Sequence, residues 1–138
     1  MAGYSGTALV KKLGIKPGFR IALVHAPNGF EEELGKLPAT VRKLSRVTRP
    51  MDFVLLFSKS AASLERDFAR FAEALVPNGM LWVAWPKKAS GVLTDLTDNS
   101  VRQIGLNVGL VDVKVCAVNE VWSGLKFVYR LQDRLLRS

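Results

Sequence analysis

The stretch Met51–Phe57, M-D-F-V-L-L-F, is an almost unbroken run of apolar residues near the middle of the 138-residue chain. A strand with one face in water alternates apolar and polar side chains, whereas a strand covered on both faces is apolar almost throughout. Sheets covered on both faces are typically parallel, with helices connecting their strands. Residues Asp52–Phe57 therefore predict a central strand of an α/β fold.

Two further apolar runs flank this stretch in the sequence. Arg20–Ala26, R-I-A-L-V-H-A, stops at a Pro-Asn-Gly sequence, and Met80–Trp85, M-L-W-V-A-W, follows another. Both runs predict buried strands bounded by turn residues. A weaker, basic strand is expected at Val41–Val47. We expect the first run and residues 52–57 to form adjacent parallel strands.

Helical periodicity is clearest between the second and third apolar runs. Leu64, Phe68 and Phe71 recur every three or four residues, which predicts a helix with one packed face. The charged residues between them are expected on its wet face: Glu65, Arg66, Asp67, Arg70 and Glu73. Shorter helices are predicted at Thr7–Leu13, from a cap at Asn28 to Leu34, and from a cap at Thr97 to a stop at Gly109.

The last third of the chain has a different pattern. Leu110–Val118 and Leu125–Gln132 alternate apolar and polar residues, as antiparallel strands with one covered face do. Asn119–Gly124 would connect them. The order of elements predicts one domain over residues 1–138, a three-layer α/β fold with a mostly parallel mixed sheet and an antiparallel C-terminal hairpin.

Composition limits the kinds of site that the chain can carry. A single cysteine, Cys116, and a single histidine, His25, exclude a disulfide framework and a multi-cysteine zinc site, so no metal is predicted. No apolar run is long enough for a membrane span, and a cytoplasmic location is expected. The net charge of +8 favours anionic ligands or nucleic acid. No base-reading motif accompanies this charge, so any nucleic-acid binding is expected to be non-specific.

Several segments together resemble class I S-adenosylmethionine-dependent methyltransferases. L-G-I-K-P-G-F-R-I-A-L-V at Leu13–Val24 resembles the entry to that fold's first strand, and Met51–Phe57 resembles its fourth. A-L-V-P-N-G-M-L-W-V at Ala74–Val83 resembles the approach to the fifth strand, and the terminal hairpin resembles the last two. The opening M-A-G-Y-S-G-T, W-P-K-K and W-S-G-L-K-F also resemble an uncharacterised bacterial family, domain of unknown function 3052, which implies no activity.

The sequence departs from the methyltransferase pattern at the cofactor positions. The resemblance implies a glycine-rich turn after the first strand and an acidic residue after the second. The chain has H-A-P-N-G, with only Gly29, at the first place and Thr48-Arg49-Pro50 at the second. About twenty residues between Gly29 and Pro50 leave room for one helix and one strand, so the third strand of the fold is expected to be missing.

Three functions therefore stay open. The first is a degenerate methyltransferase-like domain that binds an anionic small molecule or partner without methyl transfer, with no cofactor predicted. The second is an active methyltransferase with an atypical S-adenosylmethionine site. The third is a nucleic-acid accessory protein that binds without sequence preference.

Ligands of α/β sheets bind beyond the carboxyl ends of the parallel strands. We expect residues 25–29, 58–60 and 86–91 to meet there. The ligand-binding candidates are Lys87, Lys88, Ser90, Gly91, His25, Asn28, Gly29 and Trp122. Lysine charges with a serine hydroxyl and a glycine amide suit an anion, although the two lysines equally suit the wet end of a strand. His25 is either a general base or a structural histidine, and Trp122 either closes a pocket or covers the end of the sheet.

Overall fold

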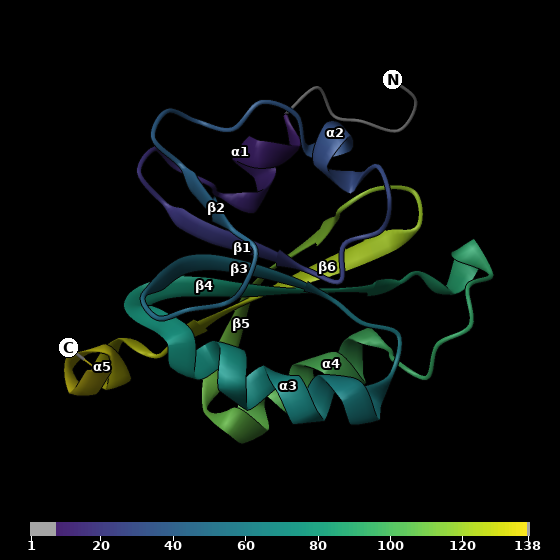
Figure 1. The fold of residues 1–138 in the computed structure, drawn as a ribbon. Helices are drawn as coiled ribbons and strands as arrows, with labels where there is room; N and C mark the ends of the chain where they lie inside the picture. The colour runs from purple at the N-terminus through teal and green to yellow at the C-terminus, as the bar shows by residue number, and fades with distance from the viewer. Residues whose placement is uncertain (1–7, 138) are drawn as a thin grey trace.

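The computed structural model describes residues 8–137, so Thr7 and the opening M-A-G-Y-S-G-T lie outside the described residues. Within this range a six-stranded sheet has the order β2-β1-β3-β4-β6-β5 (Figure 1). Its strands are β1 (Arg20–Val24), β2 (Arg42–Leu44), β3 (Met51–Phe57), β4 (Leu75–Pro86), β5 (Leu110–Ala117) and β6 (Trp122–Tyr129). The first four strands in this order are parallel, and β6 is antiparallel to both β4 and β5. The predicted mixed sheet and the adjacent parallel pair β1–β3 are confirmed.

Helices cover both faces of the sheet and make three layers. Figure 1 shows α1 (Leu9–Leu13) and α2 (Phe30–Leu34) above the sheet, with α3 (Ala61–Ala74) and α4 (Asp98–Val108) below it. The alternating side chains of β3 enter two separate cores, because Phe53 packs toward α1 and α2 while Val54 packs toward α3 and α4. Neither side chain is exposed to solvent. Full burial of such a side chain contributes about 1.5–3 kcal/mol, which is why this strand is central.

The edge strand β2 is shorter than the predicted Val41–Val47. Only residues 42–44 pair with β1, because Ser45 and Arg46 turn out into solvent. No further strand follows β2 on this side among the described residues. The expected absence of a third strand is therefore consistent with the observed strand order, and one face of β1 and β2 is left partly open beside α3.

The second Pro-Asn-Gly sequence does not separate helix from strand as predicted. Leu75 already pairs with Met51, and Met80 pairs with Phe53, so residues 76–79 form an irregularity inside β4. A Cβ on Gly79 would lie 2.9 Å from the carbonyl oxygen of Met51. This close approach of two backbones explains a glycine inside a strand.

The start of one helix and both ends of one strand differ from the predictions. The N-cap of α2 is Gly29 rather than Asn28, and no side chain caps this helix. The predicted strand Leu125–Gln132 starts earlier, at Trp122, and ends at Tyr129, because residues 131–134 form α5 (Leu131–Arg134). Thr97 caps α4 as expected, and Ser100 completes the capping box. No helix among residues 8–137 is long and apolar enough to cross a membrane.

Candidate functional site

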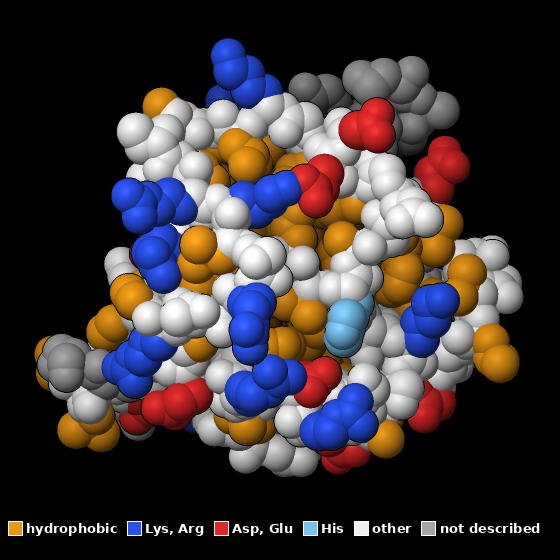
Figure 2. Space-filling view, viewed as in Figure 1, with side chains coloured by type: hydrophobic (Ala, Val, Ile, Leu, Met, Phe, Trp, Pro, Cys, Tyr) orange, Lys and Arg blue, Asp and Glu red, His pale blue; other side chains and the backbone are white. Residues whose placement is uncertain are grey.

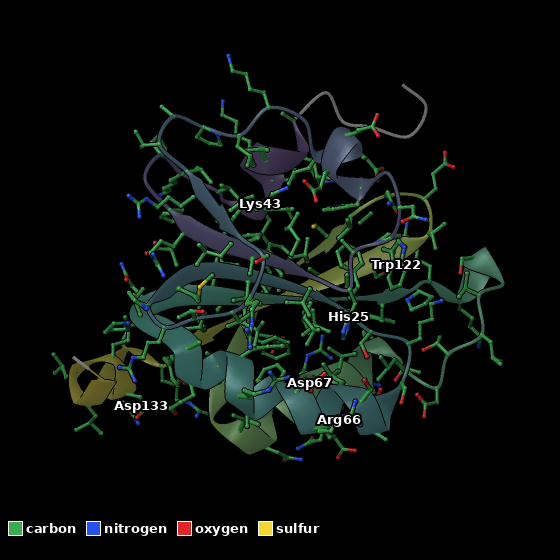
Figure 3. All side chains as sticks on the ribbon, in the orientation of Figure 1. His25, Lys43, Arg66, Asp67, Trp122 and Asp133 are labelled. Atoms are coloured by element: carbon green, nitrogen blue, oxygen red, sulfur yellow. The ribbon has the colours of Figure 1, made fainter. Side chains whose placement is uncertain are left out.

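The carboxyl ends of β1 and β3 meet the start of β6 at a cavity of about 410 Å³. We call it the histidine cavity; its lining includes His25, Pro27, Phe57, Ser58, Lys59, Ser60, Ser63 and Trp122. His25 and Trp122 were both predicted to lie in a binding site, and the structure brings them together from segments 97 residues apart. Figure 3 shows both side chains at this edge of the sheet.

Aromatic rings pack against one another on the apolar side of the histidine cavity. Trp122 packs edge-to-face on Phe57 with ring centroids 5.0 Å apart, and Phe57 packs in the same way on Phe30 at 4.9 Å. The side-chain oxygen of Asn119 accepts hydrogen bonds from the backbone N–H groups of Val121 and Trp122, both at 2.9 Å. Trp122 is the first residue of β6 rather than part of the predicted connection, and it is nearly buried.

His25 takes an unusual backbone conformation at the end of β1. Its φ of 58° lies in the left-handed region, which histidine enters more often than most non-glycine residues. Strain of this kind costs about 1–3 kcal/mol and gathers at functional sites. The exposed imidazole forms no hydrogen bond within residues 8–137. The interpretation of His25 as a hydrogen-bonded structural residue therefore loses support.

A second cavity of about 590 Å³ lies on the other side of His25. We call it the arginine cavity; its lining includes Val24, His25, Ser45, Arg46, Arg66, Asp67 and Arg70. Arg46 follows β2, whereas the other two arginines project from α3. Three arginines and one carboxylate line the cavity, which therefore has a net positive charge. In Figure 2 the histidine, in pale blue, lies near several basic side chains with an acidic side chain among them.

Asp67 is a functional candidate that the sequence analysis missed. It was expected on the wet face of its helix, but it is only 6% exposed. Its Oδ1 accepts a hydrogen bond from Arg70 Nη2 at 3.0 Å and lies 3.7 Å from Arg66 Nε. Arg70 also lies over the ring of Phe71, 4.5 Å from its centroid. A buried carboxylate needs such partners, and here it holds two guanidinium groups at the cavity wall. Figure 3 shows Asp67 and Arg66 on α3.

The predicted lysine site lies apart from both of these cavities. Lys87, Lys88 and Gly91 line a third cavity of about 630 Å³, which also contains Asp95 and Asp98. The Ser90 hydroxyl donates to the Lys87 carbonyl at 2.6 Å, and the Gly91 amide donates to the Lys88 carbonyl at 3.4 Å. These predicted anion donors are therefore used within the turn, and two carboxylates offset the lysine charges.

The remaining candidates have simpler positions. Asn28 and Gly29 are exposed in the turn before α2 and line none of the three cavities. Residues 8–137 contain no group of three or more potential metal-ligating side chains. Burial raises the pKa of Cys116. The nearby charges of Lys12 and Lys114 lower this pKa by a smaller amount, so the net shift is upward. The thiol form is favoured, which suits the interpretation of Cys116 as a packing residue.

The shape of the chain matches known enzymes, although its sequence does not. No protein-family model matches, and the search of curated proteins gives no match. A structure of magnesium protoporphyrin IX methyltransferase from Synechocystis PCC 6803 with bound S-adenosylmethionine is similar, with a TM-score of 0.63 at 9% identity over 88% of this chain and 74% of that chain. A methyltransferase from Aquifex aeolicus matches with a TM-score of 0.59 at 14% identity over 86% of both chains.

The chain has the fold of S-adenosylmethionine-dependent methyltransferases. The resemblance seen in the sequence is thereby confirmed at the level of the fold, whereas membership of the uncharacterised bacterial family gains no support. The Synechocystis enzyme has also been solved with S-adenosylhomocysteine, so this fold holds the cofactor in similar structures.

The residues at the expected cofactor position fit that cofactor poorly. Where the family pattern implies a glycine-rich turn, His25 has the left-handed conformation and extends its side chain into both cavities. The pattern implies an acid for the ribose hydroxyls directly after the second strand. Because β2 ends at Leu44, that place holds Ser45 and Arg46 rather than the expected Thr48-Arg49-Pro50. S-adenosylmethionine is a net cation, with a sulfonium and an ammonium group beside one carboxylate, so a cavity with three arginines and one carboxylate disfavours it. These residues suit an anion.

Proposed function

We propose that this chain binds an anionic small molecule at the carboxyl edge of its sheet and does not transfer methyl groups. The observation that carries the proposal is the arginine cavity, which Arg46, Arg66 and Arg70 line together with a single carboxylate, Asp67. The expected ligand bears a phosphate or carboxylate group, because the planar guanidinium fork matches those groups in a bidentate manner.

The arginines are prepared for a ligand to different degrees. Asp67 holds the two α3 arginines, so part of their rotational freedom is already lost before an anion arrives. Arg46 forms no ion pair within residues 8–137 and has all its donors free for a ligand. Each charge-assisted hydrogen bond to a bound anion contributes about 1.5–3 kcal/mol.

The histidine cavity would hold the uncharged part of the same ligand. His25 lines both cavities, so a molecule with an anionic end and a flat or apolar body can span them. Phe57 and Trp122 supply the apolar surface, and the seryl and lysyl groups at residues 58–60 supply polar contacts. The imidazole is placed to contact the ligand near the junction of its two parts.

S-adenosylmethionine binding, with methyl transfer, is the second candidate. It is favoured by similar structures that contain this cofactor or its demethylated product. The charge of the arginine cavity argues against it, so we expect weak or no binding. A one-to-one site of low-micromolar affinity in calorimetry would overturn that expectation.

The test is a titration of the purified chain with inorganic phosphate, pyrophosphate, ATP, citrate and S-adenosylmethionine, followed by thermal shift and calorimetry. Arg46→Gln should weaken the best anion about tenfold or more, which is the loss expected for one charge-assisted hydrogen bond. Asp67→Asn keeps an oxygen for Arg70 but removes the opposing charge, so it should tighten the same anion. Arg42→Gln, an exposed change on β2 outside the cavity, is the matched control.

Opposite effects of the arginine and aspartate variants are the result that supports the site. Equal affinity in wild type, Arg46→Gln and Asp67→Asn would remove the arginine cavity from consideration. The double variant Lys87→Ala with Lys88→Ala tests the other predicted site in the same assay. If this variant alone loses binding, the ligand occupies the third cavity instead.

A further inference from the structure

Four lysines from distant segments gather beside the edge strand β5. Lys12 lies in the last turn of α1, Lys16 follows that helix, Lys114 is in β5, and Lys126 is in β6. Lys126 pairs with Lys114 on one side and with Trp82 on the other. Trp82 donates its indole N–H to the Leu13 carbonyl at 2.9 Å, so this row of side chains faces α1. We call the four residues the β5–β6 lysines.

Two reciprocal hydrogen bonds fix part of this group. Lys114 Nζ donates to the Lys12 carbonyl at 2.8 Å, and Lys12 Nζ donates to the Ala117 carbonyl at 2.9 Å. These bonds hold the end of α1 on the sheet, which is a sufficient structural role for both residues. Each ammonium group has three donors, so further donors of both side chains remain for a ligand.

Lys126 and Lys16 have no comparable structural role. Neither ammonium group forms a hydrogen bond or ion pair within residues 8–137. Like charges directly opposite one another destabilise a sheet, and Lys126 faces Lys114 in such a pair. Burial lowers the pKa of Lys126, and the neighbouring Lys114 and Lys16 lower it further. The fold therefore maintains an unfavourable concentration of positive charge that packing does not explain.

We propose that the β5–β6 lysines bind the phosphate backbone of double-stranded nucleic acid. A duplex carries about one negative charge per 1.7 Å of its axis, so one phosphate chain can meet several lysines together. Lysine recognises phosphate as a point charge, which gives affinity without base specificity. Trp82 is fully buried in the same row and is not available to stack on a base, so the surface lacks the aromatic platform that single strands favour.

This surface is separate from the proposed small-molecule site. The β5–β6 lysines lie on the face covered by α1, whereas the arginine cavity lies beside α3 on the other face. The two proposals therefore rest on different residues, and either can fail while the other stands.

The experiment measures binding of the full chain to a short fluorescent DNA duplex by anisotropy over a series of salt concentrations. The test variant is Lys16→Gln with Lys126→Gln, which leaves both bonds between α1 and β5 intact. The control is Lys36→Gln with Arg42→Gln, which removes the same charge from exposed positions elsewhere. The slope of log affinity against log salt should fall by about 0.9 for each phosphate that the test variant no longer neutralises, and much less in the control.

Two further measurements separate this role from a structural one. Lys126→Arg keeps the charge and should retain duplex affinity within about threefold, since either cation neutralises one phosphate. Lys126→Gln should bind the duplex more weakly without a lower melting temperature, because it removes a crowded ammonium group. Equal reductions of the slope in test and control variants, or tight binding to phosphatidylserine vesicles without duplex binding, would overturn the proposal.

Discussion

His25 has a strained backbone conformation and also lies in the proposed ligand site. Its φ of 58° would suit glycine, and the family pattern implies a glycine-rich turn after this strand. The imidazole lines two cavities, and a glycine at this position would remove it from both. Under the proposed function, contact with a ligand accounts for a strained histidine at this point, which packing does not explain.

This explanation predicts opposite effects on stability and binding. His25→Gly relieves the left-handed strain, whereas His25→Ala keeps it, so the glycine variant should be more stable than the alanine variant by about 1–2 kcal/mol. Both should lose anion affinity equally. Urea unfolding measures the first effect and the ligand titration the second. At Ala69, an exposed position in α3, Ala→Gly should instead lower stability by about 1 kcal/mol. Equal stability of the two His25 variants would contradict the strain.

Among the helices and strands, the sequence predicted the features that follow from local residues and from burial on both faces of a strand. It missed the features that depend on contacts between distant segments. The continuous apolar run of β3 and the capping residue of α4 are local signals, and both predictions are confirmed. Residues 76–79 contain strong turn formers, but the pairing of Leu75 with Met51 keeps them within a strand. Asp67 was expected to be exposed because charged side chains usually are, whereas α3 places it in a buried position beside two arginines.

The contact between α4 and β6 gives a second test of the packing. A Cβ on Gly105 would lie 2.1 Å from the ring of Phe127, and this ring packs edge-to-face on Phe68 with centroids 5.1 Å apart. Gly105→Ala should therefore lower the free energy of unfolding by about 1–3 kcal/mol, the usual cost of overpacking a core. Asn107→Ala, on the exposed face of the same helix, should change it by less than about 0.5 kcal/mol. Urea unfolding of both variants checks this, and a neutral Gly105→Ala would show that α4 can move away from the sheet.

At the scale of the whole molecule, the candidate site arises from topology that no local pattern contains. Arg46 lies about twenty residues from Arg66 in the sequence, and neither belongs to a recognisable motif. The parallel order β2-β1-β3 brings the end of β2 beside α3, and the missing strand beyond β2 leaves that face accessible. His25 and Trp122 could be predicted from the sequence, because His25 follows one strand and Trp122 begins another at the expected edge of the sheet. The cluster of three arginines could not be predicted from the sequence, since it depends on which strands are neighbours in the sheet.

Net charge gives the last prediction. The chain has 20 basic and 12 acidic side chains, and the β5–β6 lysines concentrate part of the excess at one edge of the sheet. Such self-repulsion opposes the compact state. Raising the salt concentration from about 0.01 M to about 0.15 M shortens the Debye length from about 30 Å to about 8 Å, so the melting temperature should rise over this range. A variant with Lys16 and Lys126 changed to Gln, which keeps the bond from Lys114 to α1, should start higher and rise less. A melting temperature that falls as sodium chloride is added would mean instead that attraction within ion pairs, such as Arg102 with Asp112 at 2.9 Å, outweighs the repulsion between lysines.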